Sequence, residues 1–130
     1  MRVEKQLSVF LENQPGTLAA MCDELAKADI NILAMSVSDT ADYAVVRLVV
    51  NNPDEALHLL GNAGTLVVDS EVAVIEIDNQ VGGLGELARK LAKAGINIEY
   101  AYCTVAANQP KGTLILRTRD PRKAIKALSK

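Results

Sequence analysis

The stretch Asn13–Ile32, NQPGTLAAMCDELAKADINI, recurs 66 residues later as Asn79–Ile98, NQVGGLGELARKLAKAGINI. The two copies align without a gap, and from Glu12 and Asp78 onward 11 of 21 positions are identical. Each copy begins with Asn-Gln, passes through a glycine loop and an apolar stripe, and ends in Ile-Asn-Ile. A repeat of this length in a short chain predicts two copies of one structural unit.

Length and composition limit the class of protein. The 130 residues suffice for one ordinary domain or for two small units that share a core. The longest apolar runs are about five residues, whereas a bilayer span needs about twenty, and the N-terminal sequence MRVEKQLSVF does not have the pattern of a signal peptide. Cys22 and Cys103 stand in no CxxC or Cys/His cluster, so we expect free thiols, a cytoplasmic location and no membrane partner.

The net charge of −2 is distributed unevenly. Residues 1–66 hold four Lys/Arg and nine Asp/Glu, and residues 67–130 hold ten and seven, so the two parts carry −5 and +3. With one Phe, three Tyr and no Trp, the chain lacks the aromatic platforms on which bases stack. The basic residues near the C-terminus therefore predict a solvated helix face, or a surface facing the acidic half, and not a nucleic-acid site. They are Arg117, Arg119, Arg122, Lys123, Lys126 and Lys130.

The first half of the sequence predicts the element order βαββαβ. Helical periodicity runs from Leu18 to Ala28. A second helix starts with Asn52 as N-cap, Pro53 at the first position and Glu55 completing a capping box. Apolar alternation and short apolar runs predict the four strands as Gln6–Glu12, Ile30–Ser38, Tyr43–Val50 and Thr65–Val68.

The second half repeats these elements but ends before a fourth strand. Its predicted strands and helices are Val72–Ile77, Leu84–Ala94, Ile96–Val105, Thr113–Thr118 and a helix from Pro121 through Leu128. We therefore expect an α+β fold of two tandem ferredoxin-like units, residues 1–69 and 70–130, with the helices on one face of a continuous antiparallel sheet. The second unit lacks its last strand.

The face of this sheet away from the helices is expected to be partly apolar. The alternation of the third strand places Tyr43, Val45 and Val49 there. Together with the open edge left by the missing strand, this pattern predicts contacts between units or chains, and at least a homodimer.

The glycine loops are candidate sites for a small anion. A strand end, a glycine turn and a helix start present free backbone N–H groups at the positive end of the helix dipole. Gly16 and Gly82 permit positive φ and close approach of a ligand. Asn13 and Asn79 add donors and acceptors, so each loop could hold the carboxylate and the ammonium of a zwitterion.

Other interpretations of these residues remain open. Asn31 and Asn97 would join the loops if the first two strands end on the same side, or they only terminate helices. The segment Gly82–Gly85 has no GK[ST] or GxGxxG pattern, which disfavours a phosphate site. The single histidine, His58, belongs to no Ser/His/Asp, Cys/His or metal-ligand set, so no catalytic residue, metal or cofactor is predicted.

The two segments ENQPGTLAAMCDELAKADINI and DNQVGGLGELARKLAKAGINI resemble the start of an ACT domain, a small-molecule-sensing module of many enzymes of amino-acid metabolism. Together they cover nearly the whole chain, as in freestanding tandem ACT proteins that have no catalytic domain. The resemblance implies βαββαβ units whose sheets join side by side into eight strands, with amino acids bound at the interface between units.

The resemblance also implies ligand-binding residues, because serine-sensing members use the loop before the first helix and the Asn of the following strand. Those members carry a His two residues before the loop Asn, where this chain has Leu11 and Ile77, so the implied ligand is more apolar than serine, or the site has lost binding. The implied positions are Asn13, Gln14, Pro15, Gly16, Thr17, Leu18, Asn31 and Ile32 in the first copy, and Asn79, Gln80, Gly82, Gly83, Leu84, Asn97 and Ile98 in the second.

The leading interpretation is a regulatory protein that binds an amino acid and thereby changes its contacts with a partner enzyme. Freestanding tandem members are often encoded near aryl-acid CoA ligases, which implies an aromatic or branched-chain ligand and a partner enzyme of amino-acid or aryl-acid metabolism. The alternative is a structural or protein-interaction module that binds no small molecule. An enzyme is not expected.

Overall fold

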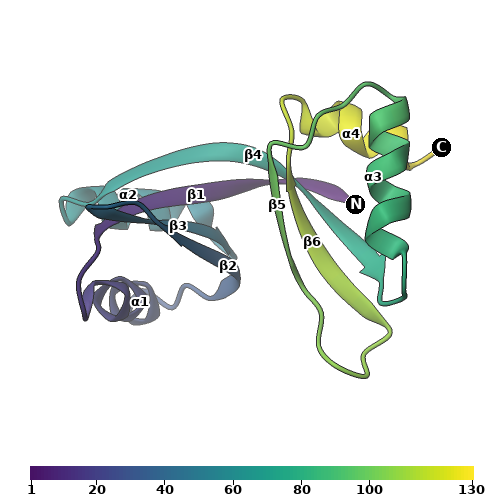
Figure 1. The fold of residues 1–130 in the computed structure, drawn as a ribbon. Coiled ribbons are helices and arrows are strands. Elements are labelled where there is room, and N and C mark those ends of the chain that lie inside the picture. Colours follow the sequence, from purple (N-terminus) through teal and green to yellow (C-terminus); the bar gives the residue numbers. More distant parts are fainter. The chain divides into compact units, whose positions relative to one another are not determined.

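The computed structural model describes residues 1–130 and has an α+β fold, as predicted (Figure 1). The strands are hydrogen-bonded neighbours in the order β2-β3-β1-β4-β6-β5. The elements are β1 (Arg2–Glu12), α1 (Thr17–Lys27), β2 (Ile32–Asp39), β3 (Tyr43–Val50), α2 (Pro53–Asn62), β4 (Leu66–Asp78), α3 (Gly83–Lys93), β5 (Tyr100–Thr104), β6 (Lys111–Arg117) and α4 (Pro121–Leu128).

The chain packs as two compact units. The N-terminal unit is Lys5–Ser70, and the C-terminal unit is Glu71–Lys130 together with Met1–Glu4. The second repeat supplies only three strands of its own, as predicted. Residues at the start of β1, the neighbour of β4, take the place of its fourth strand. Strands β1 and β4 each contribute residues to both units. The chain therefore has six strands, whereas two separate βαββαβ units would have eight.

In the N-terminal unit, α1 and α2 cover one face of the strands. The core combines alternate residues of β1 and β3 with residues at helical spacing on the two helices. Tyr43, Val45 and Val49 alternate with the core residues of β3 and so lie on the other face, as predicted. The core residues are Leu7, Val9, Leu11, Met21, Leu25, Ile30, Val46, Leu48, Val50, Ala56 and Leu60.

The C-terminal unit repeats this packing with its own core. Strands β4 and β6 contribute alternate residues, and α3 and α4 contribute one buried residue each. The buried residues of this core are Ala73, Ile75, Leu91, Leu114, Leu116 and Ala124. Each glycine loop is thereby fixed between a buried strand and a helix that packs on it.

The predicted start of α2 is confirmed, and α4 begins in the same way. Asn52 Oδ1 accepts a hydrogen bond from Glu55 N at 3.3 Å, and Asn52 Nδ2 donates to Glu55 Oε2 at 2.8 Å. In α4, Asp120 Oδ1 accepts from Lys123 N at 3.2 Å. These caps satisfy N–H groups that a helix start otherwise leaves without partners.

Several predicted strand boundaries were wrong. The first strand begins at Arg2, four residues before the predicted Gln6. The predicted strands Thr65–Val68 and Val72–Ile77 are not separate: the continuous strand β4 begins at Leu66 and runs through both, since the polar residues between them include no glycine or proline that would break it. The predicted strand Ile96–Val105 is a strand only from Tyr100 to Thr104.

Strand β5 starts later than the corresponding strand β2, and hydrogen bonds at the start of β2 explain the difference. At the start of β2, Asn31 N donates to Asn51 Oδ1 at 3.0 Å, and Asn51 N donates to Asn31 O at 3.2 Å. The residue corresponding to Asn51 is Arg119, because the two repeats are offset by two more residues after the β5–β6 turn. A guanidinium has no acceptor, so the backbone at Asn97 is not tied in this way.

Candidate functional site

The loop between β1 and α1 is held by backbone hydrogen bonds. Gln14 N donates to Glu12 O at 2.9 Å, Thr17 N to Gln14 O at 3.4 Å, and Ala20 N to Gly16 O at 3.0 Å. The Thr17 hydroxyl donates to Glu12 O at 2.8 Å. Gly16 precedes the helix with φ of 89°, a left-handed conformation that is strained for other residues.

The loop between β4 and α3 has the same geometry. Gln80 N donates to Asp78 O at 3.0 Å, Gly83 N to Gln80 O at 3.2 Å, and Glu86 N to Gly82 O at 3.0 Å. Gly82 has φ of 83°. The repeated sequence therefore specifies one loop conformation twice.

Neither helix start after these loops has a side-chain cap. The N–H groups of Leu18 and Ala19 in α1, and of Leu84 and Gly85 in α3, have no hydrogen-bond partner within the protein. Such groups, at the positive end of an 11-residue helix, favour a carboxylate or another small anion. Pro15 in the first loop and Val81 in the second are both exposed.

The two loop asparagines are bound differently. Asn79 Nδ2 donates to Gln109 O at 2.8 Å, and Asn79 N donates to Pro110 O at 3.0 Å, so the β5–β6 turn holds this residue. Asn13 N donates to Asp42 O at 3.4 Å in the β2–β3 turn. The Asn13 side chain makes no hydrogen bond within the protein and is exposed.

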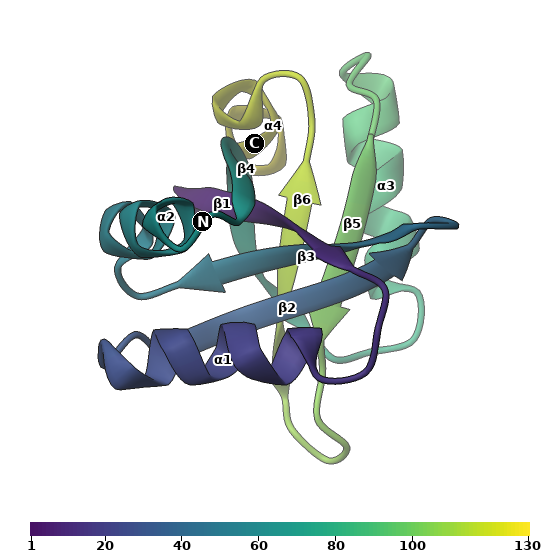
Figure 2. The same cartoon turned by 90° about the vertical axis from the view of Figure 1, so that its left-hand side faces the viewer.

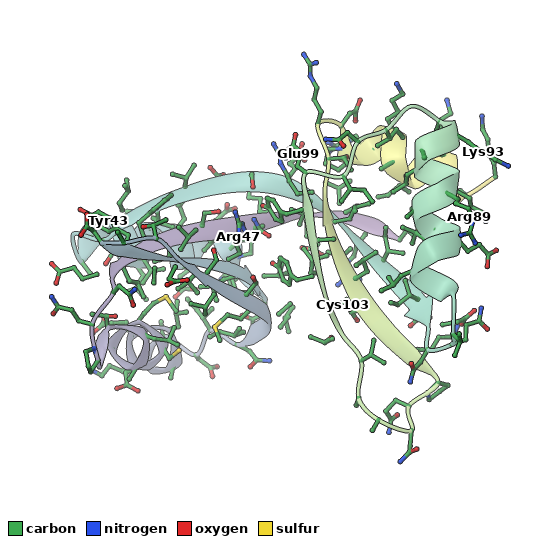
Figure 3. The ribbon with its side chains drawn as sticks, in the orientation of Figure 1. Tyr43, Arg47, Arg89, Lys93, Glu99 and Cys103 are labelled. Atoms are coloured by element: carbon green, nitrogen blue, oxygen red, sulfur yellow. The ribbon has the colours of Figure 1, made fainter.

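The residues just before the two asparagines also differ in their cross-strand partners. Asp78 lies opposite Lys111, and Lys111 Nζ is 2.6 Å from Asp78 Oδ1. The hydrogen bond and charge of Asp78 raise the pKa of Lys111 above its ordinary value. The corresponding residue Glu12 lies opposite Tyr43, which stands at the beginning of β3 (Figure 3) and offers no positive charge.

The N-terminal loop lines a hollow of about 360 Å³ beside the β2–β3 turn. Of the predicted site residues only Asn13 and Gln14 face it, while Gly16, Thr17 and Leu18 do not line it. Sequence reasoning missed its other members, because Tyr43 lies opposite Glu12 through the register of β1 with β3, which are separated by α1 and β2 in the chain. The lining residues are Glu12, Asn13, Gln14, Ala41, Asp42 and Tyr43.

The predicted site residues of the C-terminal unit face three different hollows. Gln80 and Gly83 line one of about 220 Å³ beside α3, and Asn97 lines one of about 700 Å³ at the start of α4. Leu84 and Ile98 line an apolar groove of about 220 Å³ between α3 and β5. The sequence repeat therefore does not produce one shared cavity here.

Asn31 lies far from the loop that contains Asn13. The β2–β3 ladder runs from Ile32 to Asp39, and eight residues of strand span about 25 Å. Asn13 bonds to the turn at one end of this hairpin, and Asn31 bonds to Asn51 at the other. Figure 2 shows the connection from β1 at one end of α1 and the connection to β2 at the other. One unit thus does not bring the two asparagines together, and Ile32 packs on the core.

The basic cluster near the C-terminus is partly neutralised within the C-terminal unit. Arg122 forms two hydrogen bonds with the Glu71 carboxylate, at 2.8 and 2.9 Å, and these raise its pKa further. Arg117 Nε lies 3.4 Å from Glu99 Oε1, and Arg117 also donates to Glu71 O at 2.6 Å. Exposed pairs of this kind contribute little to stability, but they reduce the positive charge of this surface.

Outside the regions described above, side chains that could perform catalysis or bind a metal do not cluster. No cluster of three or more His, Cys, Asp or Glu side chains is placed to hold a metal ion. His58 is exposed on α2. No helix has the length and apolar character to cross a membrane.

Known proteins share both the sequence pattern and the fold. The family model described as ACT domain pair matches residues 1–129. The solved protein BT0572 from Bacteroides thetaiotaomicron is 34% identical, with 98% of this chain and 87% of that chain covered and a TM-score of 0.91.

Regulatory subunits of aspartate kinase share the fold at lower identity. The ligand-free subunit from Thermus thermophilus is 18% identical, with 99% and 96% of the chains covered and a TM-score of 0.69. The subunit from Thermus flavus is 19% identical, with 98% and 94% covered and a TM-score of 0.68. No curated protein matches this sequence.

Proposed function

The chain belongs to the ACT domain family, and on that premise we propose that it binds an amino acid and regulates a partner enzyme in the cytoplasm. The partner would be an enzyme of amino-acid or aryl-acid metabolism. The chain itself would perform no catalysis, since no set of nucleophile, base and orienting group supports a reaction.

The observation that carries this proposal is the repeated loop. Gly16 and Gly82 both have a left-handed conformation before an uncapped helix, which leaves two N–H groups free at each helix end. Those groups suit a carboxylate. The amide of Asn13, which the protein leaves unbonded, supplies a donor and an acceptor for the rest of a small polar ligand.

A homodimer would complete the site. Strand β2 is the outermost strand beside β3, so its other edge is unpaired. If β2 of one chain lies antiparallel beside β2 of a second, the start of one strand meets the end of the other. Asn31 of one chain would then approach the glycine loop of its partner. An amino acid bound there favours the dimer, and the chain could regulate a partner enzyme through that equilibrium.

A protein-interaction module remains the second candidate, because the same edge strand exposes apolar side chains. Leu33, Met35 and Val37 of β2 are 51%, 40% and 49% exposed. An apolar edge of this kind is typical of a protein contact and does not require a small ligand.

A thermal-melt screen against the twenty amino acids and several aryl acids, at millimolar concentration, tests the proposal. A ligand at about a hundred times its Kd adds about 2.7 kcal/mol to the free energy of unfolding, and this raises Tm by several degrees. The variant with Gly16→Val and Gly82→Val should lose that shift. An unchanged Tm with every compound would favour the protein-interaction module.

A further inference from the structure

We propose that the C-terminal glycine loop is closed by its own chain, and that each chain binds one free α-amino acid, at the N-terminal loop, with its ammonium group on Glu12. This inference rests on the proposed function. It goes further in assigning the number of sites, their position and the charged group that the ligand must carry.

The C-terminal loop already contains a substitute for such a ligand. The Lys111 side chain brings a primary ammonium to 2.6 Å from Asp78 Oδ1, and the Gln109 carbonyl oxygen accepts a hydrogen bond from Asn79 Nδ2 at 2.8 Å. The Asn79 backbone N–H is also used, by Pro110 O. In this loop Asp78 binds an ammonium group and the Asn79 amide binds a carbonyl oxygen. Both of these bound groups belong to the β5–β6 hairpin of the same chain and not to a free ligand.

The N-terminal loop has the same backbone, and Asn13 N donates to Asp42 O as Asn79 N does to Pro110 O, but the Glu12 carboxylate and the Asn13 amide are left open. Glu12 corresponds to Asp78, and its carboxylate has no cation within salt-bridge distance. The cross-strand neighbour that corresponds to Lys111 is Tyr43, which is 53% exposed. The Asn13 amide has no partner, and the hollow of about 360 Å³ lies directly against these residues. A ligand ammonium can occupy the place that Lys111 takes in the other copy.

The charge of this hollow selects the ligand class. Glu12 and Asp42 both line it, and no Lys or Arg does. A carboxylic acid without an amino group would bring a third negative charge with nothing to balance it. An α-amino acid can place its ammonium beside these carboxylates, so amino acids should bind in preference to the corresponding deaminated acids.

Backbone amide NMR of the full chain locates the site. The ¹⁵N-labelled protein is titrated with a mixture of the twenty L-amino acids and then with each one separately. We expect shifts at residues 13, 14, 16–18 and 40–43 and unchanged signals at residues 79–84, 106–109 and 111. Shifts at both loops, or only at the C-terminal loop, would overturn the inference and leave the proposed function standing. No shift with any amino acid would overturn both.

Two matched substitutions test the role of the ammonium. Glu12→Gln should weaken binding of the amino acid found in the titration by about tenfold or more, because it removes a charge-assisted hydrogen bond. Asp78→Asn, the corresponding change in the closed loop, should change the affinity less than twofold. Equal losses in the two variants would contradict the assignment. So would equal affinity for phenylalanine and 3-phenylpropionate, or for leucine and 4-methylpentanoate, since each pair differs only in the amino group.

Discussion

Lys111 Nζ lies 2.6 Å from the carboxylate of Asp78, whereas the corresponding cross-strand neighbour of Glu12 is Tyr43. The two repeats share a loop backbone but differ in the side chain that faces the residue before the loop. A duplicated unit has thus kept the geometry that glycine permits, while the groups available to a ligand have diverged.

The raised pKa of Lys111 gives a prediction about pH. A lysine whose pKa is higher in the folded chain stabilises the fold below its unfolded pKa, and this contribution is lost as the pH rises through the raised value. In Asp78→Asn the pKa of Lys111 should fall toward its ordinary value, because the dominant hydrogen bond and charge are gone. NMR titration of the lysine side chains in the alkaline range measures both values. An unchanged Lys111 pKa would mean that the pair does not form.

The loop glycines should tolerate no side chain. Alanine at Gly16 or Gly82 should lower the free energy of unfolding by about 1–2 kcal/mol, because their φ values of 89° and 83° are strained for any residue with a Cβ. Gly61 is the matched control, since it lies inside α2 with ordinary φ and with open space where a Cβ would stand. Gly61→Ala should raise stability by about 0.5–1 kcal/mol. Urea unfolding of the three variants checks the opposite signs.

The two asparagines should respond in opposite ways to truncation. Asn79→Ala removes a hydrogen bond to the β5–β6 turn and should cost about 0.5–1 kcal/mol, with faster amide exchange at residues 106–109. Asn13→Ala breaks no side-chain bond and should leave stability nearly unchanged while weakening amino-acid binding. Hydrogen exchange and a binding titration of both variants measure the difference. A larger stability loss for Asn13→Ala would contradict the hydrogen-bond pattern.

Removal of a buried hydroxyl group in the C-terminal unit should stabilise the protein. Thr118 is fully buried and its Oγ1 has no hydrogen-bond partner. Thr118→Val keeps the shape and removes the unsatisfied group, so the free energy of unfolding should rise by about 1 kcal/mol. Thr113→Val, at a half-buried position of β6, is the control and should change little. A destabilised Thr118→Val would indicate that the hydroxyl has a partner in solution.

The proposed dimer depends on the free edge of β2. Val37→Lys places a charge on this edge at a residue that is 49% exposed, so folding should be preserved while self-association weakens by about tenfold or more. His58→Lys, on an exposed position of α2, should leave association unchanged. Sedimentation equilibrium at micromolar concentration distinguishes the two. A wild-type chain that is monomeric throughout would exclude the dimer as the site of binding.

Much of the fold was predictable because its determinants are local. The glycine loops, the capping box at Asn52 and the alternation in β3 each depend on residues within one or two turns of chain. The continuity of β4 and the placement of Met1–Glu4 in the C-terminal unit depend on pairings between distant segments, which periodicity does not report.

The site was less predictable for the same reason. The repeat identifies both glycine loops, but not that the β5–β6 turn binds Asn79 or that Lys111 reaches Asp78. Likewise, strand length and direction place Asn31 about 25 Å from the loop of its own unit, although it follows that loop closely in the sequence. Asp78 and Lys111 lie on β4 and β6, which α3 and β5 separate in the chain, so their pairing depends on the register between distant strands and not on a local turn.

Equilibrium dialysis of the wild-type chain against the twenty L-amino acids tests the central claim most directly, with the free and protein-side concentrations of each compound measured by chromatography. The account predicts that one amino acid, or a few of similar side chain, is enriched on the protein side and saturates at one per chain. Saturation at two per chain would contradict the closed C-terminal loop, and no enrichment of any amino acid would contradict the regulatory function itself.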